Sequence, residues 1–172
     1  MTSKVAAALI SAFVFTLAAA RAADAPPPDV QKTITADYAL GCTAAENPTD
    51  SNLDAAFGYL SPDYVDIDVK GKKTTRDQVV ALGKQQMKQL RTTTCDPTTE
   101  SSVLNADGTV TVVEDLHLVG TLQAPDGNHD IEVTAKAQDT WKQVNGAWMQ
   151  TQSQELRNLV KMDGNVVQDE GQ

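Results

Sequence analysis

The sequence predicts an α+β fold: one strongly bent antiparallel sheet wraps around three N-terminal helices as a cone-shaped, barrel-like domain with an internal cavity. Between Val30 and Leu90, apolar residues recur mostly every three or four positions, the spacing of helices that bury one face. From Thr92 onward the period changes to two, which is typical of strands. Helices followed by a run of long strands form an α+β order, and 172 residues suit one core.

Residues 1–22 have the pattern of a secretory signal peptide. Lys4 gives a positive start, an apolar run follows it, and Ala20 and Ala22 are small residues at the positions that a signal peptidase reads. The run is too short and too rich in alanine for a membrane span, and no cysteine follows it to carry a lipid anchor. We expect cleavage after Ala22 and a secreted or periplasmic protein without a membrane anchor.

The charge disfavours nucleic acid and anionic membranes as partners. The whole chain carries 14 Lys and Arg against 23 Asp and Glu, a net charge of −9. Cleavage would remove Lys4 and Arg21 but no acid, so 12 basic residues would remain and the net charge would become −11. Phosphate-rich partners are recognised by basic surfaces. The ordinary role of such acidity is solubility outside the cytoplasm.

The first helix follows a proline-rich lead-in, residues 23–29. The helix should begin near Asp29 and end at Asn47, because Pro48 follows. Its apolar face has the regular helical spacing and consists of Val30, Ile34, Tyr38, Cys42 and Ala45.

A second helix should begin near Ser51 and end at Ser61, where Pro62 follows. Its stripe consists of Leu53, Ala56, Phe57 and Leu60. Residues 64–69 then alternate as a short strand, with Tyr64, Asp66 and Asp68 on its polar side, until Gly71 ends it.

The third helix begins at a capping box, residues 75–78, in which Thr75 and Gln78 cover unpaired amide groups at the helix start. We expect its inward face to consist of Val79, Leu82, Gly83, Met87 and Leu90.

Long strands fill the second half of the chain. We expect strands at residues 99–104 and 109–122, then a central hairpin at residues 129–156 that turns at Asn145 and Gly146. On the first strand of that hairpin Asp139 lies within an otherwise apolar row. The domain should span residues 30–160, and residues 161–172 form a polar tail with a short apolar segment at Val166 and Val167.

Cys42 and Cys95 should form a disulfide, since this is the default state in an oxidising compartment. Closing a loop of this length would stabilise the fold by roughly 3–4 kcal/mol. A catalytic thiol is the alternative, although neither cysteine has a histidine close to it in the sequence. Two buried free thiols are the remaining possibility.

Two segments resemble a known superfamily. Residues 60–82, LSPDYVDIDVKGKKTTRDQVVAL, resemble the acidic strand, glycine turn and third helix of nuclear transport factor 2-like proteins. Residues 135–156 resemble the closing hairpin, in which Trp141, Gly146 and Trp148 have the spacing seen in that superfamily. The resemblance is closest to the small exported SnoaL-like and ketosteroid isomerase-like groups. It implies a homodimer through the outer face of the sheet, but it does not fix a function, since the fold hosts enzymes, carriers and assembly domains.

The resemblance implies a set of catalytic positions. Tyr38 matches a tyrosine on the first helix, Asp68 matches the general base, and Asp139 lies near an acid that stays neutral. Each residue also has an ordinary structural interpretation. Tyr38 could be a core residue, Asp68 could be a solvated turn residue, and Asp139 could pair with Arg157 or Lys136.

Other chemistry has weaker support in the sequence. His117 could act as an alternative base, although a histidine bonded to a neighbouring strand is the simpler interpretation. His117 and His129 are too few and too far apart to indicate a metal site, and we expect no cofactor. Residues that could line a pocket are Phe57, Met87, Leu116, Trp141 and Trp148.

Taken together, these features predict an exported domain that binds a small, largely apolar molecule between its sheet and its helices. One alternative is a cofactor-independent isomerase, cyclase or dehydratase that works by acid–base chemistry. Another is a dimeric interaction module without a ligand, in which side chains fill the cavity.

Overall fold

The computed structural model describes residues 24–171, so the predicted signal peptide lies outside the described residues. Within that range the chain forms three helices and seven strands. In chain order these are α1 (Pro28–Glu46), α2 (Asp50–Ala56), β1 (Leu60–Ile67), β2 (Lys73–Thr75), α3 (Arg76–Gln89), β3 (Leu90–Leu104), β4 (Val110–Ala124), β5 (Gly127–Val144), β6 (Ala147–Met162) and β7 (Asn165–Gly171).

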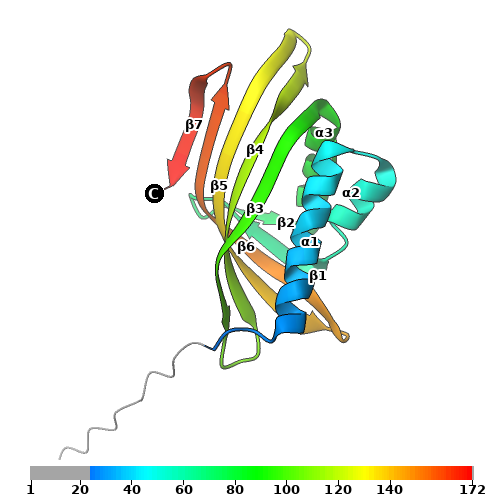
Figure 1. Ribbon diagram of the computed structural model, residues 1–172, viewed down its shortest axis with the longest axis vertical. Helices are drawn as coiled ribbons and strands as arrows, with labels where there is room; N and C mark the ends of the chain where they lie inside the picture. The colour runs from blue at the N-terminus through cyan, green and yellow to red at the C-terminus, as the bar shows by residue number, and fades with distance from the viewer. Residues whose placement is uncertain (1–23, 172) are drawn as a thin grey trace, which may run out of the picture.

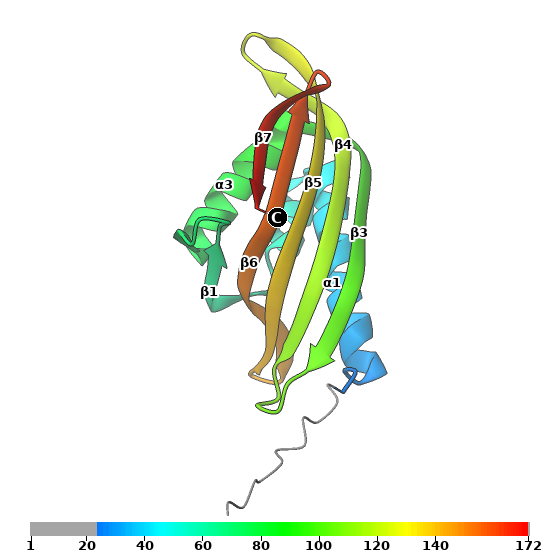
Figure 2. The same cartoon turned by 90° about the vertical axis from the view of Figure 1, so that its left-hand side faces the viewer.

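The seven strands form one curved, unclosed sheet in the order β2-β1-β6-β5-β4-β3, and β7 pairs with β6 beyond the end of β1 (Figure 1). All neighbours are antiparallel except β1 and β6, which are parallel. The helices cover one face, called here the inner face, and the view of Figure 2 shows the opposite, outer face. This architecture confirms the predicted α+β fold.

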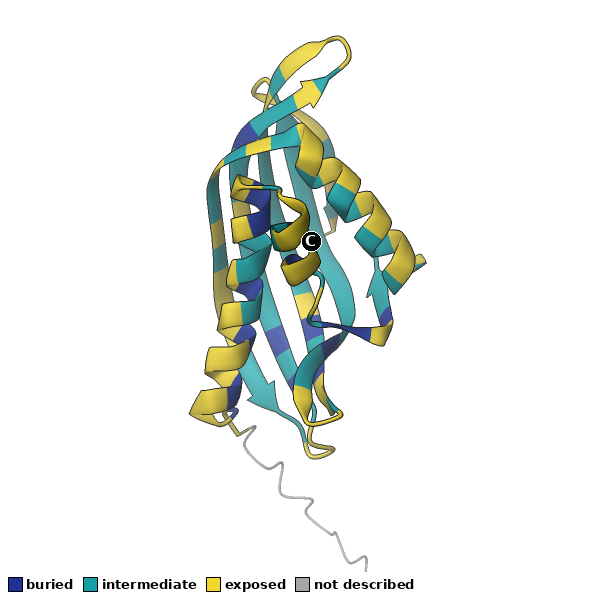
Figure 3. Ribbon diagram, turned by 90° about the vertical axis from the view of Figure 1, so that its right-hand side faces the viewer, coloured by how far each residue is buried: buried dark blue, intermediate teal, exposed yellow. Residues whose placement is uncertain are grey.

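Helix α1 begins at Pro28, where the missing N–H of proline costs no helical hydrogen bond. Val30, Ile34 and Tyr38 are buried against the sheet, as the helical spacing predicts (Figure 3). The predicted disulfide between Cys42 and Cys95 is present and joins α1 to β3, with 5.5 Å between the two Cα atoms.

Helix α2 ends at Ala56, earlier than its apolar stripe predicts. Leu60 and Ser61, expected at the end of the helix, instead begin β1, where Leu60 pairs with Gln150 of β6. The ladder is irregular after Leu60, and Pro62, which has no N–H to give to it, lies in that interval. Pairing with β6 therefore overrides the local helical pattern.

Helix α3 follows its capping box directly, and the Gln78 side-chain oxygen accepts the backbone N–H of Thr75 at 3.1 Å. One predicted inward residue is wrong: Leu82 is 54% exposed. Helix α3 has no fully buried residue, so only a narrow stripe of it meets the body of the protein. Gly83 belongs to that stripe and lies against Phe57, so closely that an added Cβ atom would lie 2.5 Å from a ring carbon.

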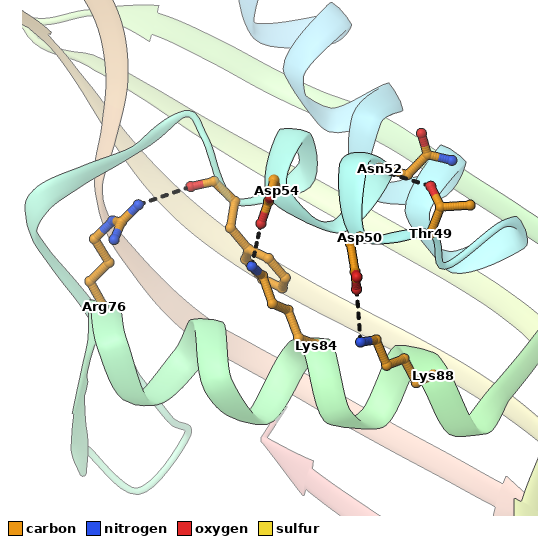
Figure 4. Close-up of polar contacts among 8 residues, drawn as sticks. Thr49, Asp50, Asn52, Asp54, Arg76, Lys84 and Lys88 are labelled. Atoms are coloured by element: carbon orange, nitrogen blue, oxygen red, sulfur yellow. Dashed lines mark hydrogen bonds and ion pairs between the residues drawn. The ribbon is translucent and has the colours of Figure 1, made fainter.

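Ion pairs join α2 to α3 along their exposed sides (Figure 4). Lys88 contacts Asp50 at 2.9 Å, and Lys84 contacts Asp54. Arg76 Nε donates to the carbonyl oxygen of Leu60 at 3.2 Å, which fixes the start of α3 against β1. Exposed pairs of this kind contribute little stability, so their role is to orient α3 over the sheet.

The long strands differ from the predicted ones mainly at their ends. The central hairpin turns at Asn145 and Gly146, whose φ angles of 51° and 84° confirm the predicted tight turn. Strand β3 begins at Leu90 rather than at residue 99. Its first part is polar, because one side of an edge strand meets solvent, so its sequence gives a weak apolar signal.

The C-terminal segment, predicted as a polar tail, instead completes β6 and forms β7. A turn at Asp163 and Gly164, with φ angles of 50° and 77°, reverses the chain, and β7 then pairs with residues 157–162 of β6. Val166 and Val167 are each 57% exposed. The backbone of β7 therefore does the pairing while its side chains stay polar or exposed.

The core consists of two clusters on the inner face. The larger contains Val30, Ile34, Tyr38, Val110, Val112 and Trp141, and the smaller contains Ala44, Leu53 and Ala56. Among residues 24–171, none of the helices is long and apolar enough to span a membrane. Dimerisation through the outer face stays a prediction.

Candidate functional site

A chain of hydrogen bonds runs through the larger core cluster. Trp141 Nε1 donates to the Tyr38 hydroxyl at 3.2 Å, and that hydroxyl donates to Asp139 Oδ2 at 2.6 Å. An indole N–H can only donate, so the hydroxyl of Tyr38 accepts from Trp141 and gives its own proton to Asp139. The structure thus brings together Tyr38 and Asp139, two of the three residues predicted as catalytic.

The second carboxyl oxygen of Asp139 lacks a well-formed hydrogen bond among the described residues. Asp139 is only 3% exposed, and Oδ1 has no hydrogen-bond partner among the described residues. Burial raises the pKa of Asp139, and the polar side chains of Tyr38, Ser153 and Gln150 oppose that shift only in part.

Two adjoining hollows lie between the sheet and the helices. The acidic hollow, of about 210 Å³, is lined by Tyr38, Phe57, Tyr59, Leu60, Tyr64, Val79, Glu114, Ala137, Asp139, Gln150 and Ser153. The apolar hollow, of about 170 Å³, is lined by Tyr38, Gly41, Cys42, Ala45, Tyr59, Met87, Cys95, Pro97, Glu114, Leu116 and Leu118. Tyr38, Tyr59 and Glu114 line both, so the two hollows adjoin; together they are called the cavity here, with an acidic end and an apolar end.

Strand register places four carboxyl groups on the inner face. Ala137 of β5 pairs with Glu114 of β4 on one side and with Glu155 of β6 on the other. Residues paired across a sheet point to the same face, so both glutamates lie beside Ala137 on the face that lines the acidic hollow.

The next row of the sheet supplies the other two carboxyl groups. Asp139 pairs with Ser153 of β6, and Ser153 pairs with Asp66 of β1. Asp66 lies two residues beyond Tyr64, which lines the acidic hollow, so the alternation along β1 gives both the same face. The four acids therefore lie around Ala137 in two adjacent rows; Glu114 and Asp139 line the acidic hollow, and Asp66 and Glu155 lie beside it on the same face.

Asp66, Glu114 and Asp139 hold their protons more tightly than ordinary carboxyl groups. Burial, together with the nearby charges of Asp139 and Asp115, raises the pKa of Glu114 to about 8. Burial and the charges of Glu155 and Asp139 raise the pKa of Asp66 to about 6. Among residues 24–171, no Lys, Arg or His lines either hollow. The missing cation explains why mutual repulsion and burial decide these pKa values.

Comparison with solved structures identifies the fold. A conserved protein from Planctomyces limnophilus aligns with a TM-score of 0.61 and 16% identity, over 78% of this chain and 98% of that one. A nuclear transport factor 2-like protein from Cytophaga hutchinsonii aligns with a TM-score of 0.56 and 18% identity, over 73% of this chain and 95% of that one. The chain has the nuclear transport factor 2-like fold.

An enzyme shares this fold with the chain. A hexachlorocyclohexane dehydrochlorinase, LinA type 2, aligns with a TM-score of 0.59 and 12% identity, over 78% of this chain and 88% of that one. No protein-family model and no curated protein sequence matches the chain. At these identities the likeness concerns the fold, and the chemistry has to come from the residues themselves.

Within the nuclear transport factor 2-like fold, Asp68 and His117, the two residues predicted as bases, lie apart from Asp139. Asp68 lies in the turn after β1, where its Oδ1 accepts the backbone N–H groups of Lys70 and Lys72, each at 2.9 Å. His117 lies on the outer face of β4, half exposed, with Nε2 3.4 Å from an oxygen of Glu132. Neither side chain lines the two hollows.

Three of the five predicted pocket residues line the cavity: Phe57, Met87 and Leu116. Trp141 lies behind the cavity wall, fully buried, with its ring packed edge-on against Tyr38. Trp148 lines a separate groove of about 450 Å³ beside α1. Trp141 is thus a core residue that supports the wall rather than a part of it.

Sequence reasoning missed Glu114 and passed over Asp66. A signal for Glu114 existed, since it lies midway between Val112 and Leu116 in the period-two row of β4. The sequence could not distinguish Asp66 from Asp68 as the functional acid, because both lie on the same side of the predicted strand. Among residues 24–171, no group of three or more His, Cys, Asp or Glu residues could hold a metal ion.

Proposed function

We propose that the protein binds a small, largely apolar molecule in the cavity between its sheet and its helices. The molecule's polar group lies against Asp139, and its apolar body lies against Met87 and Leu116. The main support for this proposal is Asp139 Oδ1, which has no hydrogen-bond partner among the described residues. A buried polar atom without a partner lowers the stability of a protein by about 1–3 kcal/mol, and a ligand group that hydrogen-bonds to it would recover this loss.

The size and lining of the cavity support this proposal. The two hollows, of about 210 and 170 Å³, adjoin, and together they reach the lower range of small-molecule sites, roughly 300–1,000 Å³. An interaction module without a ligand would fill this space with its own side chains. The unfilled hollows therefore favour ligand binding over that alternative.

A neutral probe tests the proposal directly. We expect 1-naphthalenemethanol to bind the wild-type protein, measured by calorimetry, and Leu116→Trp to abolish binding by filling the apolar hollow. Val113→Trp is the matched control, because Val113 lies on the same strand and faces outward. If the probe binds all three proteins equally, the cavity is not its site and the proposal fails.

A specific observation also favours a second candidate, an acid–base enzyme. Asp66, with a pKa of about 6, is largely ionised at neutral pH and lies two strands from Asp139, with Ser153 of β6 between them; burial raises the pKa of Asp139 as well. Two acids with separated pKa values can divide the work of a base and a hydrogen-bond donor. Asp66 would take a proton from carbon while Asp139 stabilises the oxyanion that develops.

The dehydrochlorinase among the similar structures agrees with such chemistry, since loss of hydrogen chloride includes removal of a proton from carbon. We expect the protein to speed deuterium exchange next to the carbonyl of 2-tetralone in D₂O, measured by NMR. Asp66→Asn should abolish the acceleration, and Asp68→Asn should preserve it, because an asparagine oxygen can still accept the turn hydrogen bonds. An equal loss in both variants, or no acceleration at all, would reject Asp66 as the base.

The disulfide supports the further proposal that the protein is exported. Cys42 and Cys95 are bonded, and such bonds persist in oxidising compartments. We expect mass spectrometry of the protein purified from its source to show a chain that begins at Ala23. A chain that retains residues 1–22 inside the cell would contradict export.

A further inference from the structure

We infer that the bound molecule carries an organic ammonium group, which lies between the carboxyl groups of Glu114 and Asp139. The inference rests on the proposed function and specifies its ligand. It makes the molecule a hydrophobic amine, with its cation at the acidic end of the cavity and its hydrocarbon part at the apolar end.

Two buried carboxyl oxygens at the acidic end of the cavity lack hydrogen-bond partners among the described residues. Asp139 Oδ1 and Glu114 Oε2 are both buried and have no hydrogen-bond partner among the described residues. Asp139 is 3% exposed, and both residues line the acidic hollow. A neutral oxygen atom of a ligand could satisfy one protonated carboxyl group. A primary ammonium has three N–H donors and can satisfy both carboxylates at once.

The charge of the cavity wall also favours a cation. Asp66, Glu114, Asp139 and Glu155 share the inner face around Ala137, and within residues 24–171 no ion pair involves any of them. A carboxylate ligand would add a like charge to this set and is excluded by repulsion. A cation would instead supply the counter-charge that the wall lacks.

Spacing distinguishes an organic cation from a metal ion. Asp139 pairs with Val112, and Glu114 lies two residues further along β4, so the two acids are diagonal neighbours about 7–8 Å apart at their Cα atoms. Metal ions such as Ca²⁺ need several oxygens at about 2.3–2.6 Å, and no such group exists among the described residues. Ammonium–carboxylate hydrogen bonds of about 2.8 Å allow the wider arrangement.

The aromatic lining fits the same ligand. Tyr38, Phe57, Tyr59 and Tyr64 all contribute to the acidic hollow. Aromatic faces attract ammonium groups by about 0.5–2 kcal/mol, more when water is excluded. Rings and carboxyl groups together are the usual means of binding an amine whose body is apolar.

Binding should release protons, since an ammonium favours the ionised form of the acids beside it. The titratable groups that face the site come from α1, the α2–β1 connection and four strands: Tyr38, Tyr59, Tyr64, Asp66, Glu114, Asp139 and Glu155. All are acids, and three are tyrosines whose pKa values burial raises further. The affinity for an amine should therefore rise with pH between about 5 and 8, where Glu114 loses its proton.

Three probes of similar size test the inference: 1-naphthylmethylamine, 1-naphthalenemethanol and 1-naphthoate. Calorimetry at pH 7, in two buffers with different ionisation heats, gives each affinity and the number of protons released. We expect the amine to bind at least ten-fold more tightly than the alcohol, with proton release, and naphthoate not to bind. If the alcohol binds as tightly as the amine, the inference fails while the proposed function stands; if neither binds, the proposed function fails as well.

Two isosteric variants locate the cation. Glu114→Gln should weaken binding of the amine about ten-fold or more and weaken binding of the alcohol by a clearly smaller factor. Glu132→Gln is the matched control on the outer face of β5, and it should leave both affinities unchanged. An amine that binds Glu114→Gln as tightly as the wild type, or that releases no protons on binding the wild type, would overturn the inference.

Discussion

The two faces of the sheet treat acidic side chains in opposite ways. On the outer face Glu132 contacts Lys161 at 3.0 Å, and along the adjoining β6–β7 edge Asp169 contacts Arg157 at 2.9 Å. On the inner face, within the part of the chain that the structure describes, no basic residue lines the cavity beside Glu114 and Asp139. Acids on the outer face thus have basic partners although water already solvates them. Among the described residues, the acids of the inner-face cavity have no such partner, although burial makes an unpaired carboxylate costly.

The contrast is visible in the pKa values of two glutamates on adjacent strands. Hydrogen bonding to Lys161 lowers the pKa of Glu132, whereas burial raises the pKa of Glu114 to about 8. An apolar residue at position 114 would remove that cost. The presence of a glutamate at this position therefore indicates that the inner face serves a purpose other than stability.

The largest effect should be the dependence of stability on pH. The folded pKa of Glu114, about 8, lies above the value of about 4.5 for an unfolded chain, so the folded state binds more protons between these values. The free energy of unfolding should therefore be highest near pH 4.5 and fall by about 4 kcal/mol as the pH rises to 8. Denaturant titrations from pH 4.5 to 8 measure the slope.

Glu114→Gln should flatten this slope, and carboxyl-carbon NMR should show the late titration of Glu114 in the wild type. Glu132→Gln serves as the outer-face control. The lowered pKa of Glu132 stabilises the fold above its unfolded value, so this variant should differ from the wild type in pH dependence only in acid, near or below pH 4.5. Equal slopes in all three proteins would remove the contrast between the faces.

The next effect concerns the disulfide, which fastens α1 to β3 on the inner face. Replacing Cys42 and Cys95 together by serine should lower the free energy of unfolding by roughly 3–4 kcal/mol, because the unfolded chain gains the freedom of an open loop. Urea denaturation measures the loss. A reductant should destabilise the wild type by a similar amount and leave the double variant unchanged. A disulfide that contributes nothing would show that α1 holds the inner face without it.

A smaller effect should follow from Tyr38→Phe. The variant leaves Asp139 Oδ2 without its donor and Trp141 Nε1 without its acceptor, which should cost about 1–3 kcal/mol. In a background with Asp139→Leu the same substitution should cost less, because the carboxyl group that needs the donor is gone. Denaturation of the four proteins gives the coupling. Strictly additive losses would mean that the hydrogen bond does not stabilise the inner face.

The smallest effect should come from the outer face. Lys161→Gln removes the partner of Glu132, yet both side chains keep a large exposed fraction and water solvates the remaining carboxylate. The denaturation midpoint should stay within experimental error at neutral pH. A loss as large as that of Tyr38→Phe would show that the two faces do not differ in the way described.

The sequence predicted most of the fold because its signals were local. The Asn145–Gly146 turn, the capping box at Thr75 and the helical spacing of Tyr38 each depend on residues a few positions apart. Misassigned ends lie where long-range pairing decides, as at Leu60, which joins β1 because Gln150 of β6 pairs with it. No local pattern contains that information.

The candidate site was only half predictable for the same reason. Tyr38 and Asp139 could be singled out, since one lies on an apolar helical stripe and the other in an apolar strand row. That their oxygens lie 2.6 Å apart is a property of the assembled sheet and helix. Asp66 and Asp68 are equivalent in the strand pattern, and only the turn that occupies the Asp68 carboxyl distinguishes them.

Strand β7 has a consequence for solubility. It covers residues 157–162 of β6, whose backbone groups would otherwise be an open edge able to pair with another chain. Its own outer edge carries Asp169 and Glu170, charges that discourage further pairing. A chain truncated after Asp163 should keep its core but aggregate at concentrations where the full chain scatters no excess light. The last residues, polar as they are, thus act as a cap against intermolecular sheet growth.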